Sequence, residues 1–472
     1  MDGLRILASI IQRSFNIFPA GAHHQGETYQ GCYGFQWTFT HDSYAYTGFM
    51  EDTTQGICPA CEGTHAHTPY QSAGVNEKGL SITATETLIG IEQFEEVDPY
   101  KPNGIEEAEI TTVLLSEAAT AREAMLLLTS IYAETGAYYG AGVIAADREE
   151  AWYIECMSGT QYAAVKMNPD ILMVNPNLSV IGRIDLDDSE HVVCSKALID
   201  TAIAAGTFVG DKEANVIDYA SSYCNTKYTT SELRMRALIN YLTASDTFDI
   251  TAEGWLTNPE MYAITNLDPD GNLVPLHTPI QAAIPLNLKS VINGFRVQPA
   301  ARDMNAETHV FEVNLSDSTE TGFVEWVGMG YCGITVFVPC YPMLINEVHP
   351  SLCIGRGQAE MLKEKPESGV CFEMEKGWVV YPDGWENSMY WVFEGLYHVA
   401  MADESAAKDI TAAMLALQDE VYDAWAALQT LVSQTDVSKA ETATQGSMAI
   451  AEMVYQRAKT LLDTYLGNAS IK

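Results

Sequence analysis

The sequence predicts a layered α+β protein, and three observations carry that prediction. Four short apolar runs are separated by the turns Asp-Arg-Glu, Met-Ser-Gly and Asn-Pro-Asp, which are short enough to force antiparallel pairing. Strands and helices come in groups instead of alternating one by one, which favours separate layers over a doubly wound parallel sheet. Two long helices rich in Ala, Met, Leu and Gln close the chain. The apolar runs are 141–147, 150–155, 161–166 and 171–174, and the long helices are expected at about 403–434 and 443–466.

The remaining elements follow from the period of the apolar positions. Alternating or aromatic-rich runs predict strands, whereas apolar residues three and four apart predict helices. Strands are expected at 15–18, 33–40, 308–313, 322–329 and 333–339. Helices are expected at 108–134, 194–205, 214–223 and 231–243.

A turn that feeds a half-buried strand stands at residues 73–87. Residues 76–79 (Asn-Glu-Lys-Gly) form a turn signal, and apolar and polar residues alternate through the following 80–85. An ordinary strand with one face on a core explains this period. The period alone therefore predicts a structure and no chemistry.

The composition is that of a globular protein with a strong excess of acidic residues. The 472-residue chain is 47% hydrophobic, and 63 acidic against 25 basic residues give a formal net charge of −38. A field of this sign repels phosphate backbones and anionic lipids, and no uncharged apolar run reaches the ~18 to 20 residues of a membrane helix. We therefore expect neither nucleic acid nor a membrane as a partner, whereas a small substrate and a homo-oligomer stay open.

One cluster of cysteines and histidines has the donors of a metal site. Cys58, Cys61, His65 and His67 are the ligand types of a tetrahedral structural zinc ion. A short-loop disulfide between Cys58 and Cys61, and plain loop residues, are the alternatives, because zinc modules usually space their ligand pairs further apart. We expect no required cofactor and, at this loop, a candidate structural zinc ion.

Six segments carry a likeness that goes beyond period and composition. They are Asn76–Thr87, Ala121–Ala124, Ala151–Glu155 with Ser158 and Gly159, Asn175–Asn177, Glu307–Phe311 and Ser388–Phe393. In this order they resemble the bacterial dipeptidase family of N-terminal-nucleophile cysteine hydrolases, of the dipeptidase A type. The resemblance implies a four-layer αββα sandwich. It also implies hydrolysis of small unblocked dipeptides by a cysteine at the mature N-terminus, whose own α-amine accepts the thiol proton.

The resemblance also points to side chains around the nucleophile. The family places a side-chain amide at Asn177, or at Asn175 near it, and such an amide can donate a hydrogen bond to an oxyanion. The alternative is a structural Asn beside Pro in a turn. Glu155 and Glu86 are the carboxylates expected to hold a dipeptide's α-ammonium, with solvated strand ends as the alternative. His309, on an alternating strand, is expected to be a satisfied structural residue rather than a base.

Residues 1–13 do not share the likeness. Residue 1 is methionine, whose thioether is no nucleophile, and 1–13 hold no counterpart of the Gly-Arg-(Ser/Thr/Asn)-Glu-Asp segment that the family has. Codons compatible with Met-Asp-Gly-Leu-Arg-Ile, read two bases later, encode Gly-Arg-Ser-Glu-Asp. We therefore expect 1–13 to be an out-of-frame N-terminus, with a pseudoenzyme that lost its N-terminus as the alternative. The expected parts are 1–13, a hydrolase domain at 14–400, and a helical segment at 401–472 packed on it.

The expected function is that of a dipeptidase-family peptide hydrolase, inactive in the form written because its nucleophile and Arg/Asp motif are absent. An amidase acting on a non-peptide acyl amide and a non-catalytic binding protein are the alternatives. A carboxylate that binds an ammonium group would distinguish a dipeptidase from an amidase. A nucleophile would distinguish both enzymes from a binding protein. The written chain shows no secretory leader, which would place it in the cytoplasm, whereas a natural start elsewhere would allow secretion.

Overall fold

The computed structural model divides the chain into two compact units. Unit 1 comprises Met1–Phe18, Tyr46–Thr64 and Ala301–Lys472, and unit 2 comprises Pro19–Ala45 and His65–Ala300. The domain boundaries expected after residues 13 and 400 stay a prediction. The structure describes residues 13–31, 33–51, 70–86, 88–167, 173–175, 177–224, 229–244, 287–301, 306–315, 317–353, 359–374, 377–435 and 438–467.

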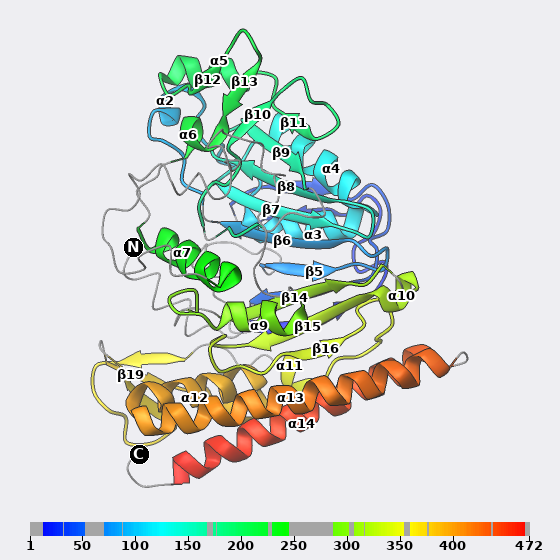
Figure 1. The fold of residues 1–472 in the computed structure, drawn as a ribbon, viewed down its shortest axis with the longest axis vertical. Coiled ribbons are helices and arrows are strands. Elements are labelled where there is room, and N and C mark those ends of the chain that lie inside the picture. Colours follow the sequence, from blue (N-terminus) through cyan, green and yellow to red (C-terminus); the bar gives the residue numbers. More distant parts are fainter. Residues whose placement is uncertain are drawn as a thin grey trace. The chain divides into compact units, whose positions relative to one another are not determined.

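Unit 2 is built on a six-stranded antiparallel sheet (Figure 1). Its order is β11-β9-β8-β7-β6-β5, in which β5 to β9 pair as neighbours in the sequence, and this confirms the predicted meander for the first three runs. The predicted run 171–174 is not its last strand, because Met173 and Val174 lie in irregular structure and β11 pairs with β9 instead. The strands are β5 (Ala73–Val75), β6 (Ser81–Glu86), β7 (Ala141–Ala146), β8 (Ala151–Cys156), β9 (Tyr162–Lys166) and β11 (Val192–Cys194).

Both faces of this sheet are buried. Ile82, Ala145 and Trp152 form one row of Cα partners and are each 0% exposed. In the neighbouring row Tyr153 pairs with Val165, and these two are also buried. Since neighbouring rows point to opposite faces, apolar side chains cover the sheet on both sides.

Two helices pack on the sheet where one helix, 108–134, was predicted. α3 (Glu107–Glu117) contacts β5 and β6, and α4 (Ala121–Glu134) contacts β7, β8 and β9. The chain leaves the helix between them, and the Thr120 side chain accepts a hydrogen bond from the Glu123 N–H (3.1 Å), which is an N-cap. The prediction of a continuous helix was wrong because a capping Thr looks like any polar position in a helical period.

The Asn76 side chain ties the β5–β6 turn to the end of α3. Its Nδ2 donates to the carbonyls of Leu115 (3.0 Å) and Ala118 (2.8 Å), and its Oδ1 accepts from the N–H groups of Lys78 (3.0 Å) and Leu80 (3.1 Å). Carbonyls in the last turn of a helix have no partner within the helix, so a buried amide that binds two of them closes the end. The Asn-Glu-Lys-Gly signal therefore has a structural use.

A loop at 41–44 covers two more of these carbonyls. Tyr44 N–H donates to the Ser116 carbonyl (3.2 Å), and His41 Nε2 lies 3.1 Å from the Glu117 carbonyl. The other ring nitrogen of His41 lies 2.7 Å from the Asp42 carbonyl. Because both nitrogens face acceptors, the doubly protonated imidazolium fits best, and these contacts outweigh burial to raise the pKa of His41.

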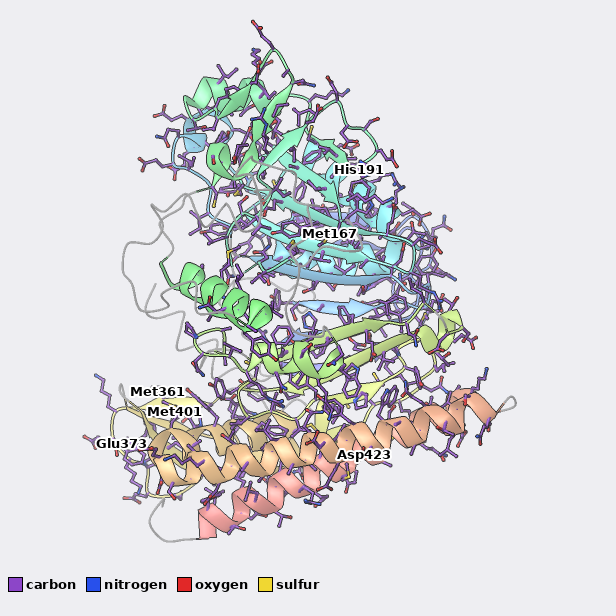
Figure 2. All side chains as sticks on the ribbon, in the orientation of Figure 1. Met167, His191, Met361, Glu373, Met401 and Asp423 are labelled. Atoms are coloured by element: carbon purple, nitrogen blue, oxygen red, sulfur yellow. The ribbon has the colours of Figure 1, made fainter. Side chains whose placement is uncertain are left out.

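The rest of unit 2 consists of short elements. The prediction of a helix at 214–223 was wrong for its first half, because Val216 and Ile217 form a strand that pairs with β10 before α6 begins. His191 (Figure 2) precedes β11 and pairs with Asp188 at 3.0 Å. These elements are β2 (Thr28–Gln30), β3 (Gln36–Thr38), α2 (Phe94–Val97), β10 (Arg183–Asp185), α5 (Leu198–Ala205), β12 (Gly210–Asp211), β13 (Val216–Asp218), α6 (Tyr219–Tyr223), α7 (Thr229–Thr243) and α9 (Leu288–Phe295).

Unit 1 contains a second antiparallel sheet, in the order β14-β15-β16, and a β1–β4 pair. β15 is buried along its whole length, as expected for a central strand. The elements before the closing helices are β1 (Arg13–Phe18), β4 (Tyr46–Glu51), β14 (Glu307–Val313), α10 (Thr319–Gly322), β15 (Phe323–Met329), β16 (Val338–Cys340), α11 (Pro350–Cys353), β17 (Glu360–Leu362), β18 (Cys371–Met374), β19 (Gly377–Val380) and η2 (Trp385–Asn387).

Three helices close the chain and pack on each other. α12 (Met389–Ala402) is buried over most of its length and contacts β15, and α14 (Lys439–Gly467) contacts β16. α13 (Glu404–Gln434) lies beside both (Figure 1). Met401, where α12 ends, is 65% exposed (Figure 2). No helix in the described part of the chain could span a bilayer. Antiparallel sheets, grouped helices and the long closing helices confirm the α+β class.

Candidate functional site

The candidate site lies where β6, β7 and β8 come to one end of the six-stranded sheet. The register places Thr85, Gly142 and Glu155 in one row across the three strands. The next row holds Glu86 and Ala141. The two carboxylate residues that the sequence singled out therefore lie in adjacent rows of the same sheet end.

Glu155 is a fully buried carboxylate with hydrogen-bond donors around it. One carboxylate oxygen accepts from the Val180 N–H at 2.8 Å, and the other accepts from the Ser179 hydroxyl. The Tyr219 hydroxyl donates to its backbone carbonyl at 3.1 Å. Burial raises the pKa of Glu155 to about 7, although the bonds from Ser179 and Val180 oppose that rise.

Asn175 joins this network through Tyr153. Its side-chain amide donates to the Tyr153 hydroxyl, and Tyr153 stands two residues before Glu155 on the same face of β8. A hydrogen bond from Tyr153 also stabilises the charged form of Glu155. Asn177 adopts a left-handed backbone conformation (φ 63°), which Asn tolerates better than most residues. The segment from Asn175 to Val180 is thus held on the sheet end by buried side chains.

The structure brings together some of the predicted site residues. Glu155 and Asn175 share one network, and Asn177 lies within the same anchored segment. Of Glu86 only the backbone is described, paired with Ala141. Sequence reasoning missed Tyr153, although its position two residues before Glu155 on a strand was a signal that the two share a face.

Ser179 and Tyr219 were missed as well, and no signal could have found them. They lie 24 and 64 residues from Glu155 along the chain and meet it only through the fold.

The predicted metal ligands cannot be placed. Cys58, Cys61, His65 and His67 lie outside the described residues, and the structural zinc ion stays a prediction. Within the described ranges, no group of three or more His, Cys, Asp or Glu side chains converges to hold an ion.

His309 in unit 1 makes the structural contacts expected of it. Its Nδ1 lies 3.0 Å from a Glu307 carboxylate oxygen, and its ring stands 5.3 Å from that of Phe49. Burial lowers the pKa of His309, but the charge of Glu307 outweighs it and the pKa rises. Glu325 is a second buried carboxylate, which accepts from the Thr47 hydroxyl (2.7 Å); burial raises its pKa to about 8.

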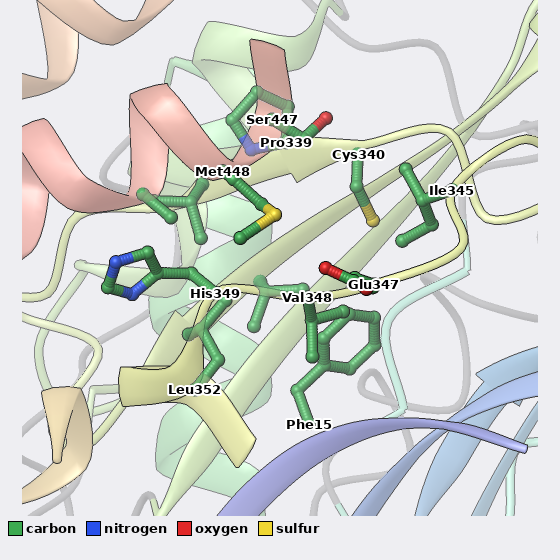
Figure 3. Close-up of a pocket in the computed structure, with 13 residues that line it drawn as sticks. Phe15, Pro339, Cys340, Ile345, Glu347, Val348, His349, Leu352, Ser447 and Met448 are labelled. Carbon is green, nitrogen blue, oxygen red and sulfur yellow. The ribbon is translucent and has the colours of Figure 1, made fainter. Parts of the chain in front are cut away.

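A small apolar cavity lies in unit 1 (Figure 3). Its volume of about 20 Å³ is room for about one water molecule, so it holds no peptide. His349 on its wall lies between the Ser351 hydroxyl (2.8 Å) and the Glu452 carboxylate (2.7 Å), an order like that of a catalytic relay. The Ser351 backbone N–H donates to the same ring nitrogen (3.3 Å), and Ser351 is buried. The arrangement is a cap on α11, with no space for a substrate.

Comparison with known proteins identifies the family. The sequence model of peptidase family C69 matches residues 10–246, just over half of the 472 residues. The chain belongs to peptidase family C69. The matched region contains all of the described sheet end, including Tyr153, Glu155 and Asn175, and the predicted family is confirmed.

Several proteins similar to this chain carry dipeptidase names. A probable dipeptidase B of Streptococcus pyogenes serotype M1 is 33% identical over 176 residues, which are 37% of this chain and 33% of the relative. This chain thus spans about a third of that relative's length. A probable dipeptidase of Salmonella dublin is 26% identical over 337 residues, which are 69% of this chain and 73% of the relative.

A solved structure also aligns with this C69 chain. A crystal structure of a variant of conjugated bile acid hydrolase from Clostridium perfringens covers 71% of this chain and 83% of that one, at 10% identity and a TM-score of 0.24. A score of that size does not establish a shared fold.

Proposed function

We propose that this C69 chain is a peptide hydrolase of the dipeptidase type. The match of the C69 model over residues 10–246 carries the proposal, and the dipeptidase names of its relatives supply the class of substrate. The net charge of −38 agrees with a substrate that keeps a free ammonium group.

In the proposed mechanism a cysteine with a free α-amine is the nucleophile. The amine takes the thiol proton, the thiolate attacks the peptide carbonyl carbon, and the proton passes to the departing amine as the C–N bond breaks. Water then hydrolyses the thioester and restores the thiol.

The amide of Asn175 or Asn177 is proposed to donate a hydrogen bond to the oxyanion. The Asn175 amide has two N–H groups and uses one on Tyr153, which leaves the other for a substrate. The Glu155–Val180 bond supports the proposal because it fixes the segment from which both side chains project. A fixed donor costs no reorganisation when charge develops on the substrate.

Glu86 is proposed to bind the dipeptide's α-ammonium. Its row and the row of Glu155 face opposite sides of the sheet, so this role requires a dipeptide that lies across the sheet end. The sequence offers Glu155 for the same role, but that carboxylate is 0% exposed and both its oxygens accept hydrogen bonds within the fold. Its position favours a role in holding the segment 175–180.

The test compares an unblocked dipeptide with its N-acetylated form, using protein made with the start encoded by its own gene. We expect the unblocked dipeptide to be cleaved far faster. Glu86→Gln should raise KM for the unblocked substrate and leave the acetylated one unchanged, whereas Glu77→Gln, in the neighbouring exposed turn, should change neither. Equal cleavage of both substrates, or a preference for non-peptide acyl amides, would contradict the proposal and favour an amidase.

A further inference from the structure

A second pocket lies in unit 2, just beyond the end of β8. Its volume is about 180 Å³, enough for a small organic molecule but below the usual range for larger ligands. The walls are mostly apolar or aromatic, and acidic side chains stand among them. The lining residues are Ile89, Gly90, Ile91, Glu92, Phe94, Glu95, Asp98, Tyr100, Tyr139, Met157 and Ser158.

Close backbone packing makes the walls of this pocket rigid. A Cβ on Gly90 would stand 2.1 Å from the Met157 carbonyl oxygen, and one on Gly159 would stand 2.0 Å from that of Pro99. Approaches this close exclude any side chain. The segments 89–100 and 157–159 therefore meet as fixed backbone, and the pocket between them is preformed.

Asp98 joins the same two segments and has no spare capacity for a ligand. One of its oxygens accepts from the Ser158 hydroxyl (2.8 Å) and the Thr160 N–H (2.7 Å). The other accepts from the Thr160 hydroxyl (2.9 Å) and lies 3.6 Å from the Lys101 ammonium. Asp98 is thus neutralised by Lys101, which stands outside the lining, and acts as part of the wall.

The other groups of the pocket favour a cation. Glu92 and Glu95 are exposed at its rim, and none of the described residues that line it is basic. Tyr100 and Tyr139 stack with ring centroids 5.6 Å apart and offer π faces that attract ammonium groups. The Tyr100 hydroxyl oxygen lies behind the pocket wall, so only the ring of Tyr100 is offered to a ligand.

We propose that this pocket binds a small organic ammonium ion that carries an apolar or aromatic group. The apolar group packs on Ile89 and Ile91, which line the pocket and are partly exposed. The ammonium faces the tyrosine rings and the two rim carboxylates. Binding needs no nucleophile, so the inference stands apart from the proposed peptidase activity.

The experiment measures binding to the full-length protein by calorimetry, with phenethylamine and hydrocinnamate as probes of similar size and opposite charge. We expect phenethylamine to bind at least about tenfold more tightly. Tyr100→Leu should weaken it severalfold by removing one aromatic ring from the pair that faces the ammonium. The double variant Glu92→Gln/Glu95→Gln should weaken it by about threefold, a modest effect because both carboxylates are exposed.

The matched control is Glu134→Gln/Glu149→Gln, which removes the same charge from exposed positions of unit 2 outside the pocket. It should leave the affinity unchanged. Equal binding of the two probes, equal losses in the two double variants, or no binding of phenethylamine at millimolar concentration would each overturn the proposal. Loss of binding in a protein that still cleaves dipeptides would overturn this inference alone.

Discussion

Replacing Glu155 by Gln should flatten the pH dependence of stability between about pH 4.5 and pH 7. The carboxylate is fully buried, and burial raises its pKa from the usual 4.5 to about 7. Within that window the folded protein keeps a proton on Glu155 that the unfolded chain has released. The folded state therefore binds more protons, and its stability falls as pH rises through the window.

The size of the effect follows from the gap between the two pKa values. A gap from about 4.5 to about 7 corresponds to roughly 3 kcal/mol at about 1.4 kcal/mol per pH unit. Gln cannot ionise and keeps one oxygen to accept from the Val180 N–H (2.8 Å), while the Ser179 hydroxyl can rotate to accept from its amide. We expect the variant to fold. The free energy of unfolding of the variant minus that of the parent should be larger at pH 8 than at pH 4.5.

Urea unfolding of the two proteins from pH 4.5 to pH 8 checks this prediction. Glu149→Gln, at an exposed position of the same unit, should reproduce the parent's profile. Parallel profiles for Glu155→Gln and the parent would show that the buried carboxylate does not titrate in this window, and the reasoning would fail. Amide exchange at Val180 provides a second readout, because Glu155→Ala removes its acceptor and should speed exchange.

Further predictions concern the end of α3. Asn76→Ala should lower the free energy of unfolding by roughly 2 to 4 kcal/mol, because it leaves two carbonyls at the end of α3 and two turn N–H groups without their hydrogen-bond partner. Urea unfolding measures this loss. A loss below about 0.5 kcal/mol would contradict the capping role. The pKa of His41 is raised in the fold, so its contribution to stability is present at low pH and is lost as pH rises through that pKa. His41→Gln should remove this pH dependence near neutrality, and NMR titration of the ring should show the raised value in the parent.

The sequence could predict the sheet of unit 2 because its signal is local. Three of the four runs in 141–174 are strands of one meander, and the two closing helices match α13 and α14 closely. The split between α3 and α4 could not be seen in the same way. It involves the Thr120 cap and also Asn76, which lies about forty residues before the carbonyls that it binds and reaches them only in the folded chain.

The candidate site was predicted only in part, for a physical reason. The resemblance named Glu155, Asn175 and Asn177, but strand periodicity could not show whether the Glu155 carboxylate meets solvent, substrate or protein. Its partners, Ser179 and Val180, follow Asn177 in irregular structure that carries no periodic signal. The role of Glu155 as an anchor therefore emerges only from burial and from atomic distances.

Thiol trapping during dipeptide hydrolysis tests the proposed cysteine nucleophile. Protein produced with the start that its gene encodes is incubated with iodoacetamide, its residual turnover of an unblocked dipeptide is measured, and the alkylated residue is located by mass spectrometry. We predict loss of turnover in step with alkylation of one cysteine whose own α-amine is free. Turnover that survives complete alkylation would show that another group is the nucleophile, and the proposed mechanism would be wrong.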